Sequence, residues 1–272
     1  MTEEPLLGYW LTTESEDVGQ QPERVAAAVT EGLRGPLQAT ADAIVNSLRA
    51  PYRDIEVHMY EQATVTSAQY GLERMITARP FRAQRYPSGG RLELLEYAIS
   101  LVTVDGFYAE FGVYKGESLL FMAAMIDKVA YGFDAFEGLP TDWFLSVKNG
   151  HFGQSGQAPE LQAAQGNLRL LKGWFADTLP QFRESITGPA AFIHVNCDVY
   201  ESTKTVFDIL GDRIVAGTVL LFSGYWNYPG WQYHEFKAFQ EFCAAAKVKY
   251  RYIGFTPTMY SVAVVIESVG QS

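Results

Sequence analysis

The sequence predicts an α/β fold with a mostly parallel sheet that ends in an antiparallel hairpin, preceded by an α-helical N-terminal segment. Three observations predict it. From residue 91 onward, short β-rich runs alternate with stretches of helical periodicity, which is typical of parallel strands joined by right-handed crossovers. No helix separates the last two β-rich runs, so one of them must be antiparallel to the rest. Residues 1–85 show helical spacing without strands.

The N-terminal segment, residues 1–85, is predicted to contain three helices, at Glu23–Leu33, Leu37–Leu48 and Val65–Ile76. Pro22 suits a helix start, while Gly35-Pro36 and Ala50-Pro51 are expected to break the helical run. The apolar helix faces suit either dimerisation or a lid over the active site, and the sequence does not distinguish these two roles.

The remaining residues, 86–272, form the predicted α/β domain. Its parallel strands are expected at Gly106–Phe111, Ala130–Phe133, Leu168–Lys172, Ala191–Val195 and Thr218–Phe222. Helices are expected at Leu92–Val102, Ser118–Lys128, Thr203–Leu210 and Tyr233–Ala246. The closing hairpin pairs Tyr250–Phe255 with Ser261–Glu267. This order is the layout of class I (Rossmann-like) methyltransferases and differs from that of a plain dinucleotide dehydrogenase.

Composition excludes several classes of partner. The formal net charge of -10 argues against nucleic acid, whose binding depends on neutralising phosphates. Two cysteines without short spacing, Cys197 and Cys243, favour a reducing, cytoplasmic location. Met1–Pro5 lacks the basic and apolar regions of a secretory signal. The longest uncharged run, Ile214–His234, contains glycines and a proline, so no membrane segment is expected.

The loop after the first predicted strand is the first candidate binding site. In such sheets the ligand lies beyond the carboxyl ends of the strands. Gly112 and Gly116 allow a sharp turn and a close approach to a ligand, in a run from Glu110 to Ser118. Asp134, about 20 positions further on, suits a ribose diol, because a carboxylate accepts both hydroxyl protons. The alternative for Asp134 is a residue that only caps a turn.

Three longer motifs identify a family. Phe133–Pro140 reads F-D-A-F-E-G-L-P and resembles the D-S-F-E-G-L-P motif of the macrocin O-methyltransferase family. Gly173–Pro180 matches that family's G-x-F-x-D-T-L-P, and Asp198–Thr203 matches its D-L-Y-x-S-T. Gly89–Leu92 resembles a degenerate form of the stretch before its first strand. The resemblance covers residues 86–267. The family consists of S-adenosylmethionine enzymes that methylate sugar hydroxyls in antibiotic biosynthesis, so the resemblance implies an enzyme of this kind.

The resemblance assigns cofactor roles to matched positions. Glu110, Gly112 and Gly116 would line the methionine part of S-adenosylmethionine, and Ser118 belongs to the same cofactor-binding set. Asp134 would bind the ribose, with Ala135 and Phe136 beside it, and Gly173, Trp174 and Phe175 would border the adenine. Trp174 suits a flat ring but also suits plain core packing. Asp198 is included in both the cofactor-binding and the catalytic set.

The family's magnesium ligands are mostly replaced. Where the family has D-x-D after the fourth strand, this chain has Asn196-Cys197-Asp198. Where the family has D-D-Y after the fifth, it has Ser223-Gly224-Tyr225. Magnesium prefers hard oxygen ligands that include carboxylates, so we expect no metal or only weak binding.

Without a metal, another group must take the proton of the acceptor. His234, Asp198 and Tyr225 are the candidate catalytic residues, and His234 is the preferred base because histidine titrates near neutral pH. A surface or helix-start position explains His234 equally well. His194 lies within a predicted strand, which favours a structural role.

The sequence therefore predicts a metal-independent S-adenosylmethionine-dependent O-methyltransferase that acts on a small natural product and forms a homo-oligomer. An aromatic or polyketide-like hydroxyl is the preferred acceptor, and an amine is an alternative. Two other functions stay open. One is a methyltransferase-fold enzyme recruited to cyclisation, a pericyclic reaction or hydroxylation, and the other is a non-catalytic binding subunit.

Overall fold

The computed structural model describes residues 21–270. The predictions made for Met1–Pro5 and for the first part of the N-terminal segment fall outside these residues. The chain divides between Glu56 and Val57 into two compact units, so the end of the first helix belongs to the α/β unit. The boundary expected at residue 85 stays a prediction.

The first helix, α1, runs without interruption over Gln21–Arg74. The breaks predicted at Gly35-Pro36 and Ala50-Pro51 are therefore wrong. A proline removes one backbone hydrogen bond and can bend a helix, but the helical spacing on both sides is sufficient for the helix to continue here. Among the described residues, no helix is both long and apolar enough to span a membrane.

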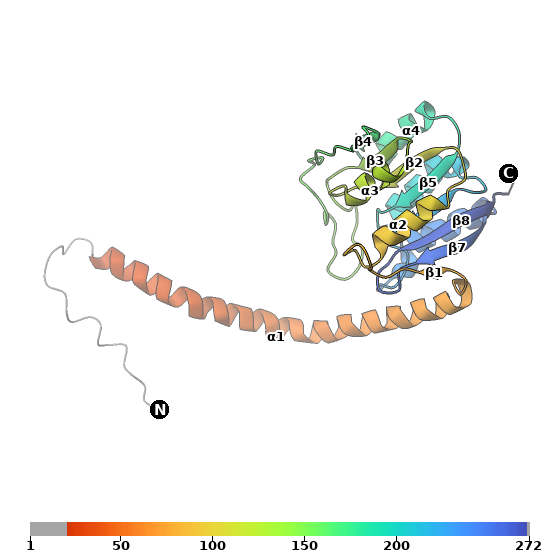
Figure 1. Ribbon diagram of the computed structural model, residues 1–272. Helices are drawn as coiled ribbons and strands as arrows, with labels where there is room; N and C mark the ends of the chain where they lie inside the picture. The colour runs from red at the N-terminus through yellow and green to blue at the C-terminus, as the bar shows by residue number, and fades with distance from the viewer. Residues whose placement is uncertain (1–20, 271–272) are drawn as a thin grey trace. The chain divides into compact units, whose positions relative to one another are not determined.

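An eight-stranded sheet forms the centre of the α/β unit (Figure 1), in the order β1-β7-β8-β6-β5-β2-β3-β4. The strands are β1 Arg79–Pro80, β2 Phe107–Phe111, β3 Ala130–Asp134, β4 Leu168–Lys172, β5 Ala190–Val195, β6 Val219–Phe222, β7 Lys249–Phe255 and β8 Val262–Ser268. All neighbouring strands pair in parallel except β8, which is antiparallel to both β6 and β7. The predicted terminal hairpin is confirmed.

Helices cover both faces of this sheet, which is what a largely parallel sheet requires. One hydrophobic cluster joins the sheet to α2 and α3, and another joins it to α4, α5, α6 and the end of α1. The helices are α2 Arg91–Ser100, α3 Glu117–Met125, α4 Phe175–Ser185, α5 Tyr200–Leu210 and α6 Glu235–Ala245, with 3₁₀ turns at Gly211–Arg213 and Trp231–Tyr233. Helix α4 and the short strand β1 were not predicted.

The loops that follow β2, β3, β5 and β6 converge because parallel strands present their carboxyl ends at one edge of the sheet. The strand order places β2 between β3 and β5, with β6 beyond β5. Residues from four separate parts of the sequence therefore meet at this edge.

Candidate active site

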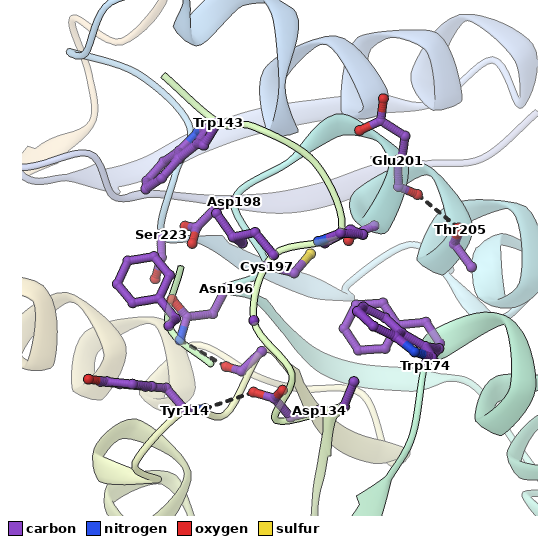
Figure 2. Close-up of a pocket in the computed structure, with 18 of the residues that line it drawn as sticks. Tyr114, Asp134, Trp143, Trp174, Asn196, Cys197, Asp198, Glu201, Thr205 and Ser223 are labelled. Atoms are coloured by element: carbon purple, nitrogen blue, oxygen red, sulfur yellow. Dashed lines mark hydrogen bonds between the residues drawn. The ribbon is translucent and has the colours of Figure 1, made fainter. Parts of the chain in front are cut away.

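A cavity of about 440 Å³ lies at the carboxyl ends of these strands. Figure 2 shows Asp134, Tyr114 and Trp174 at one end, Asp198, Ser223 and Trp143 at the other, and Asn196 between them. The lining residues are Arg91, Gly112, Tyr114, Asp134, Ala135, Gly138, Leu139, Pro140, Trp143, Phe152, Gly173, Trp174, Phe175, Ala176, Asn196, Cys197, Asp198, Glu201, Ser202, Thr205, Ser223, Met259, Tyr260 and Ser261.

The carboxylate of Asp134 holds the loop between β2 and α3. Its Oδ2 accepts hydrogen bonds from the backbone N–H groups of Val113 and Tyr114, each at 2.8 Å, and its Oδ1 accepts one from Phe136 at 2.7 Å. A carboxylate offers about four acceptor positions, so capacity remains for a hydroxyl proton from the cavity. Asp134 thus fixes a turn, as the alternative expected, and it also lines the cavity.

Glycine is required at position 112 of the same loop. Its φ is 93°, and a Cβ atom there would lie 2.0 Å from the carbonyl oxygen of Asn196. The loop after β2 therefore packs directly on the loop after β5. On the other side of Asp134, Gly173 donates its N–H to the Asp134 carbonyl at 3.0 Å, and the Trp174 side chain is 39% exposed beside the cavity.

Seven of the predicted cofactor-binding residues line the cavity: Gly112, Asp134, Ala135, Gly173, Trp174, Phe175 and Asp198. The other four, Glu110, Gly116, Ser118 and Phe136, do not. Glu110 and Ser118 are buried under the cavity and bond to each other, Oγ to Oε1, at 2.6 Å. The strand turns the Glu110 side chain into the sheet packing, and the cofactor role of these four residues stays a prediction.

A pair of acidic side chains organises the opposite end. Glu235 is fully buried and accepts the backbone N–H of Asp198 on Oε1 at 3.0 Å and that of Gly224 on Oε2 at 2.7 Å. It thereby ties the loop after β5 to the loop after β6. Burial and the nearby Asp198 charge raise the pKa of Glu235 well above its usual range.

Asp198 itself lines the cavity with φ at 65°, a strained backbone for a residue other than glycine. Burial raises its pKa to about 7, partly opposed by the positive charge of Arg91. Arg91 also lines the cavity, and its guanidinium lies 3.0 Å from the carboxylate of Glu117. This end of the cavity therefore presents a carboxyl group that changes charge near neutral pH.

Tyr225 and His234 lie outside the cavity lining, and their catalytic roles stay predictions. Tyr225 is fully buried, and its hydroxyl is 2.6 Å from the hydroxyl of Tyr252 in the core. The His234 ring lies near the buried Tyr228 ring, with centroids 6.2 Å apart, and burial lowers its pKa. Both side chains are directed into the packing between the loop after β6 and its neighbours.

The donor set fits magnesium poorly. The macrocin family has acidic residues at the four positions occupied here by Asn196, Asp198, Ser223 and Gly224. Asp198 is the one carboxylate among them. Both oxygens of nearby Glu235 are engaged by backbone N–H groups. A Cβ at Gly224 would lie 3.2 to 3.3 Å from Trp143, Asp198 and Glu235, which leaves little room for a second acidic side chain there. Within residues 21–270, no cluster of three or more His, Cys, Asp or Glu could hold a metal ion.

An aromatic wall borders the acidic end. The Trp143 ring lies 5.0 Å from that of Tyr228 and 6.4 Å from that of Tyr260. Behind it, Phe144 contacts Tyr60 of α1 with ring centroids 6.3 Å apart. The wall offers flat apolar surface to a bound molecule.

Sequence reasoning missed several of these residues. Glu235 accepts a hydrogen bond from the backbone of Asp198, which is 37 positions away in the sequence, so no local pattern identifies it. Trp143 and Tyr260 were absent from the candidates because they lie in connecting segments. Phe152 lies in a Gly- and Gln-rich stretch whose backbone is hydrogen-bonded to the carbonyl oxygen of Phe136 through Gln154 and Gly156. An aromatic inside such a polar stretch was the available signal.

Comparisons with known proteins indicate the kind of domain that holds this cavity. Residues 109–225 match the family model described as a methyltransferase domain. The curated 8-demethyl-8-(2,3-dimethoxy-alpha-L-rhamnosyl)-tetracenomycin-C 4'-O-methyltransferase of Streptomyces olivaceus is 29% identical over 164 residues. That alignment covers 50% of this chain and 60% of the relative, so the chain spans less than two thirds of the relative's length.

Two solved structures are similar to this chain, and the fold is shown by the first of them. The O-methyltransferase NovP matches with a TM-score of 0.50 and 21% identity, over 65% of this chain and 79% of its own. The calicheamicin methyltransferase CalS11 gives a TM-score of 0.48 and 19% identity, over 64% and 76% of the two chains. The chain thus has the Rossmann-like methyltransferase fold that its sequence predicted.

Proposed function

We propose that the protein is an S-adenosylmethionine-dependent O-methyltransferase of a small natural product. One observation carries the proposal: Asp134, Gly112 and Trp174 line the same cavity as Asp198 and Ser223. One end offers a carboxylate, exposed backbone and a flat ring, which suits a nucleoside. The other end offers polar groups and an aromatic wall, which suits an acceptor. The methyltransferase-domain match over residues 109–225 supports the same assignment.

The residues present fit the cofactor. Asp134 would accept a hydroxyl proton of the ribose, and the Trp174 ring would cover the adenine. Tyr114 and Gly112 would border the methionine part. When bound, S-adenosylmethionine supplies an activated methyl group, so the protein contributes mainly positioning of the acceptor oxygen and removal of its proton.

The acceptor is proposed to be a small molecule with an aromatic or polyketide-like hydroxyl, methylated without a metal. Trp143, Met259 and Tyr260 supply the apolar surface, and Asp198 supplies a hydrogen-bonding group close to the reacting oxygen. The name of the curated relative gives a rhamnosyl hydroxyl of a tetracenomycin as its acceptor, which supports a small natural-product acceptor in general and makes a sugar hydroxyl the alternative to an aromatic one. We also propose that the protein is a homo-oligomer in the cytoplasm.

Calorimetric titration with S-adenosylmethionine tests the cofactor assignment. Asp134→Ala should weaken binding about tenfold to a hundredfold, since it removes a charged acceptor worth roughly 1.5–3 kcal/mol. Asp127→Asn, an exposed acidic residue after α3, is the matched control and should bind like the wild type. Unchanged affinity in Asp134→Ala would remove Asp134 from the ribose role.

Transfer is tested with isotopically labelled methyl groups and a set of aromatic and glycosylated hydroxyl acceptors. Label in the acceptor, undiminished by excess chelator, supports metal-independent methylation. Turnover lost with chelator and restored by magnesium contradicts metal independence. Tight cofactor binding without transfer would indicate a recruited, non-methylating enzyme, and absence of binding would indicate a non-catalytic subunit.

A further inference from the structure

Three polar side chains form a row from the cavity wall into the sheet. Ser223 lines the cavity, and its Oγ lies 2.9 Å from Nε2 of His194. Nδ1 of His194 lies 3.4 Å from Oε2 of Glu110, and these two side chains are 1% and 0% exposed. Register explains the row, because Glu110 and His194 are paired residues on β2 and β5 and so share one face of the sheet.

The hydrogen bonds around the row define which atoms remain available. Oε1 of Glu110 accepts the Ser118 hydroxyl at 2.6 Å and the Asn196 amide at 3.4 Å. Oε2 of Glu110 and Nδ1 of His194 have no other hydrogen-bond partner among the described residues. These two buried atoms face each other. A proton on Nδ1 of His194 that is donated to Oε2 of Glu110 gives both atoms a hydrogen-bond partner.

This arrangement fixes the other ring nitrogen. A neutral imidazole carries one proton, so Nε2 of His194 is then a bare acceptor and receives the Ser223 O–H. The lone pairs of Ser223 Oγ are left to face the cavity. Ser223 is thus prepared to accept a proton from a molecule bound there.

We propose that Ser223, His194 and Glu110 form a proton relay that deprotonates the acceptor hydroxyl. This inference rests on the proposed methyl transfer. The acceptor oxygen uses the electron pair of its O–H bond to bond the methyl carbon, and the carbon–sulfur bond breaks with its pair left on sulfur. The acceptor proton passes to Ser223 Oγ while the original Ser223 proton passes to Nε2 of His194. The resulting imidazolium is neutralised by the Glu110 carboxylate beside it.

The row has two properties that the other candidates lack. His234 and Tyr225 lie outside the cavity lining. Asp198 has Glu235 beside it, but both oxygens of Glu235 accept backbone N–H groups and no hydrogen bond joins the two side chains. Ser223 touches the cavity and is the catalytic residue of the relay. His194 and Glu110 act through Ser223 and are positioning residues, so the structural role expected for His194 is extended by this proposal.

Nitrogen NMR of the protein labelled with ¹⁵N-histidine tests the resting state without any acceptor. The chain has 4 histidines, and the His194→Gln variant identifies the signal of His194. We expect a neutral ring with the proton on Nδ1 at neutral pH. A proton on Nε2, or a charged ring, would overturn the relay, since neither form can accept the Ser223 proton.

Single-turnover methylation of two phenols, 4-nitrophenol and 4-methylphenol, tests proton removal. At mildly alkaline pH the first is largely ionised and needs no base, whereas the second keeps its proton. Ser223→Ala and His194→Gln should lower the methylation rate of 4-methylphenol about a hundredfold. The methylation rate of 4-nitrophenol should stay within about threefold of the wild-type rate. Ser223→Thr keeps the hydroxyl and should restore most of the rate.

The outcomes separate the hypotheses. Equal losses for both phenols would show a structural effect and overturn the relay. An acidity-dependent loss in Asp198→Asn, with Ser223→Ala unaffected, would place the proton on Asp198 and also overturn it. If the wild type methylates neither phenol while binding S-adenosylmethionine, the proposed phenolic acceptor fails, and the His194 tautomer measured by NMR still decides the relay.

Discussion

The two ends of the cavity are built in different ways. At the end containing Asp134, a carboxylate binds backbone N–H groups of residues close to the ends of β2 and β3, and Gly112 provides the required left-handed turn. At the end containing Asp198, the buried acid Glu235 bridges two loops, and both acids have raised pKa values. The first end is a cradle of closely packed backbone, formed by the Gly112 loop, Asp134 and the backbone of Asn196. The second end depends on the protonation of buried side chains.

This difference teaches where each end is vulnerable. The cradle should fail when a side chain is added, because its atoms are already in contact. The acidic end should fail when an acceptor is removed or when pH changes. Substitutions that separate these two modes of failure are therefore informative about the assignment of the cofactor and the acceptor.

The largest expected effect is at the cradle. Gly112→Ala places a Cβ 2.0 Å from the Asn196 carbonyl oxygen at a φ of 93°, so strain and overpacking together should cost about 4 kcal/mol of unfolding free energy. Urea unfolding measures it. Gly166→Ala is the matched control, since Gly166 also has positive φ, at 65°, but nothing within 4 Å of its Cβ position. Equal destabilisation of both variants would show that strain alone acts at Gly112.

Removing the bridge at the acidic end comes next. Glu235→Ala leaves the buried N–H groups of Asp198 and Gly224 without acceptors, which should lower the unfolding free energy by about 3 kcal/mol. Glu235→Gln keeps one acceptor oxygen and should be less destabilised. Cofactor affinity, measured on the folded fraction, should change little because the Asp134 end is separate. A loss of cofactor affinity as large as that of Asp134→Ala would contradict the division into two ends.

How far the sequence predicted each end follows from this construction. The glycine loop and Asp134 were predictable because turn geometry depends on residues near each other in sequence and on a known strand order. The antiparallel hairpin was predictable because no helix lies between its strands. Glu235, Trp143 and the His194–Glu110 contact were not, since each depends on side chains brought together by register or by loops distant in sequence. The breaks predicted in α1 were wrong because the helical pattern on both sides of Gly35-Pro36 and Ala50-Pro51 continues through these dipeptides.

The pH dependence of stability should come from the acidic end. The folded pKa of Asp198, about 7, lies above its unfolded value of about 4, so folding favours the protonated form. The resulting stability is complete below the unfolded pKa and is lost as pH rises toward about 7. With solvent screening the expected loss is about 2 kcal/mol, measured by urea unfolding across this range. Asp198→Asn should reduce the slope; the remainder includes Glu235, whose raised pKa acts in the same direction, and His234, whose lowered pKa acts in the opposite one. An identical slope in both proteins would remove Asp198 as its source.

The smallest effect is expected behind the acidic end, where tyrosine hydroxyls support the loop after β6. Tyr252 has its hydroxyl 2.6 Å from that of Tyr225 and 2.5 Å from that of Tyr70 on α1. Tyr252→Phe should therefore cost about 1 kcal/mol, because it removes the group that both hydroxyls share while Gln240 still donates to Tyr225 at 3.2 Å. Tyr233→Phe, at a side chain 70% exposed, is the control and should unfold like the wild type. If Tyr252→Phe also lowers cofactor affinity, the cluster supports the whole cavity and the two ends are not independent.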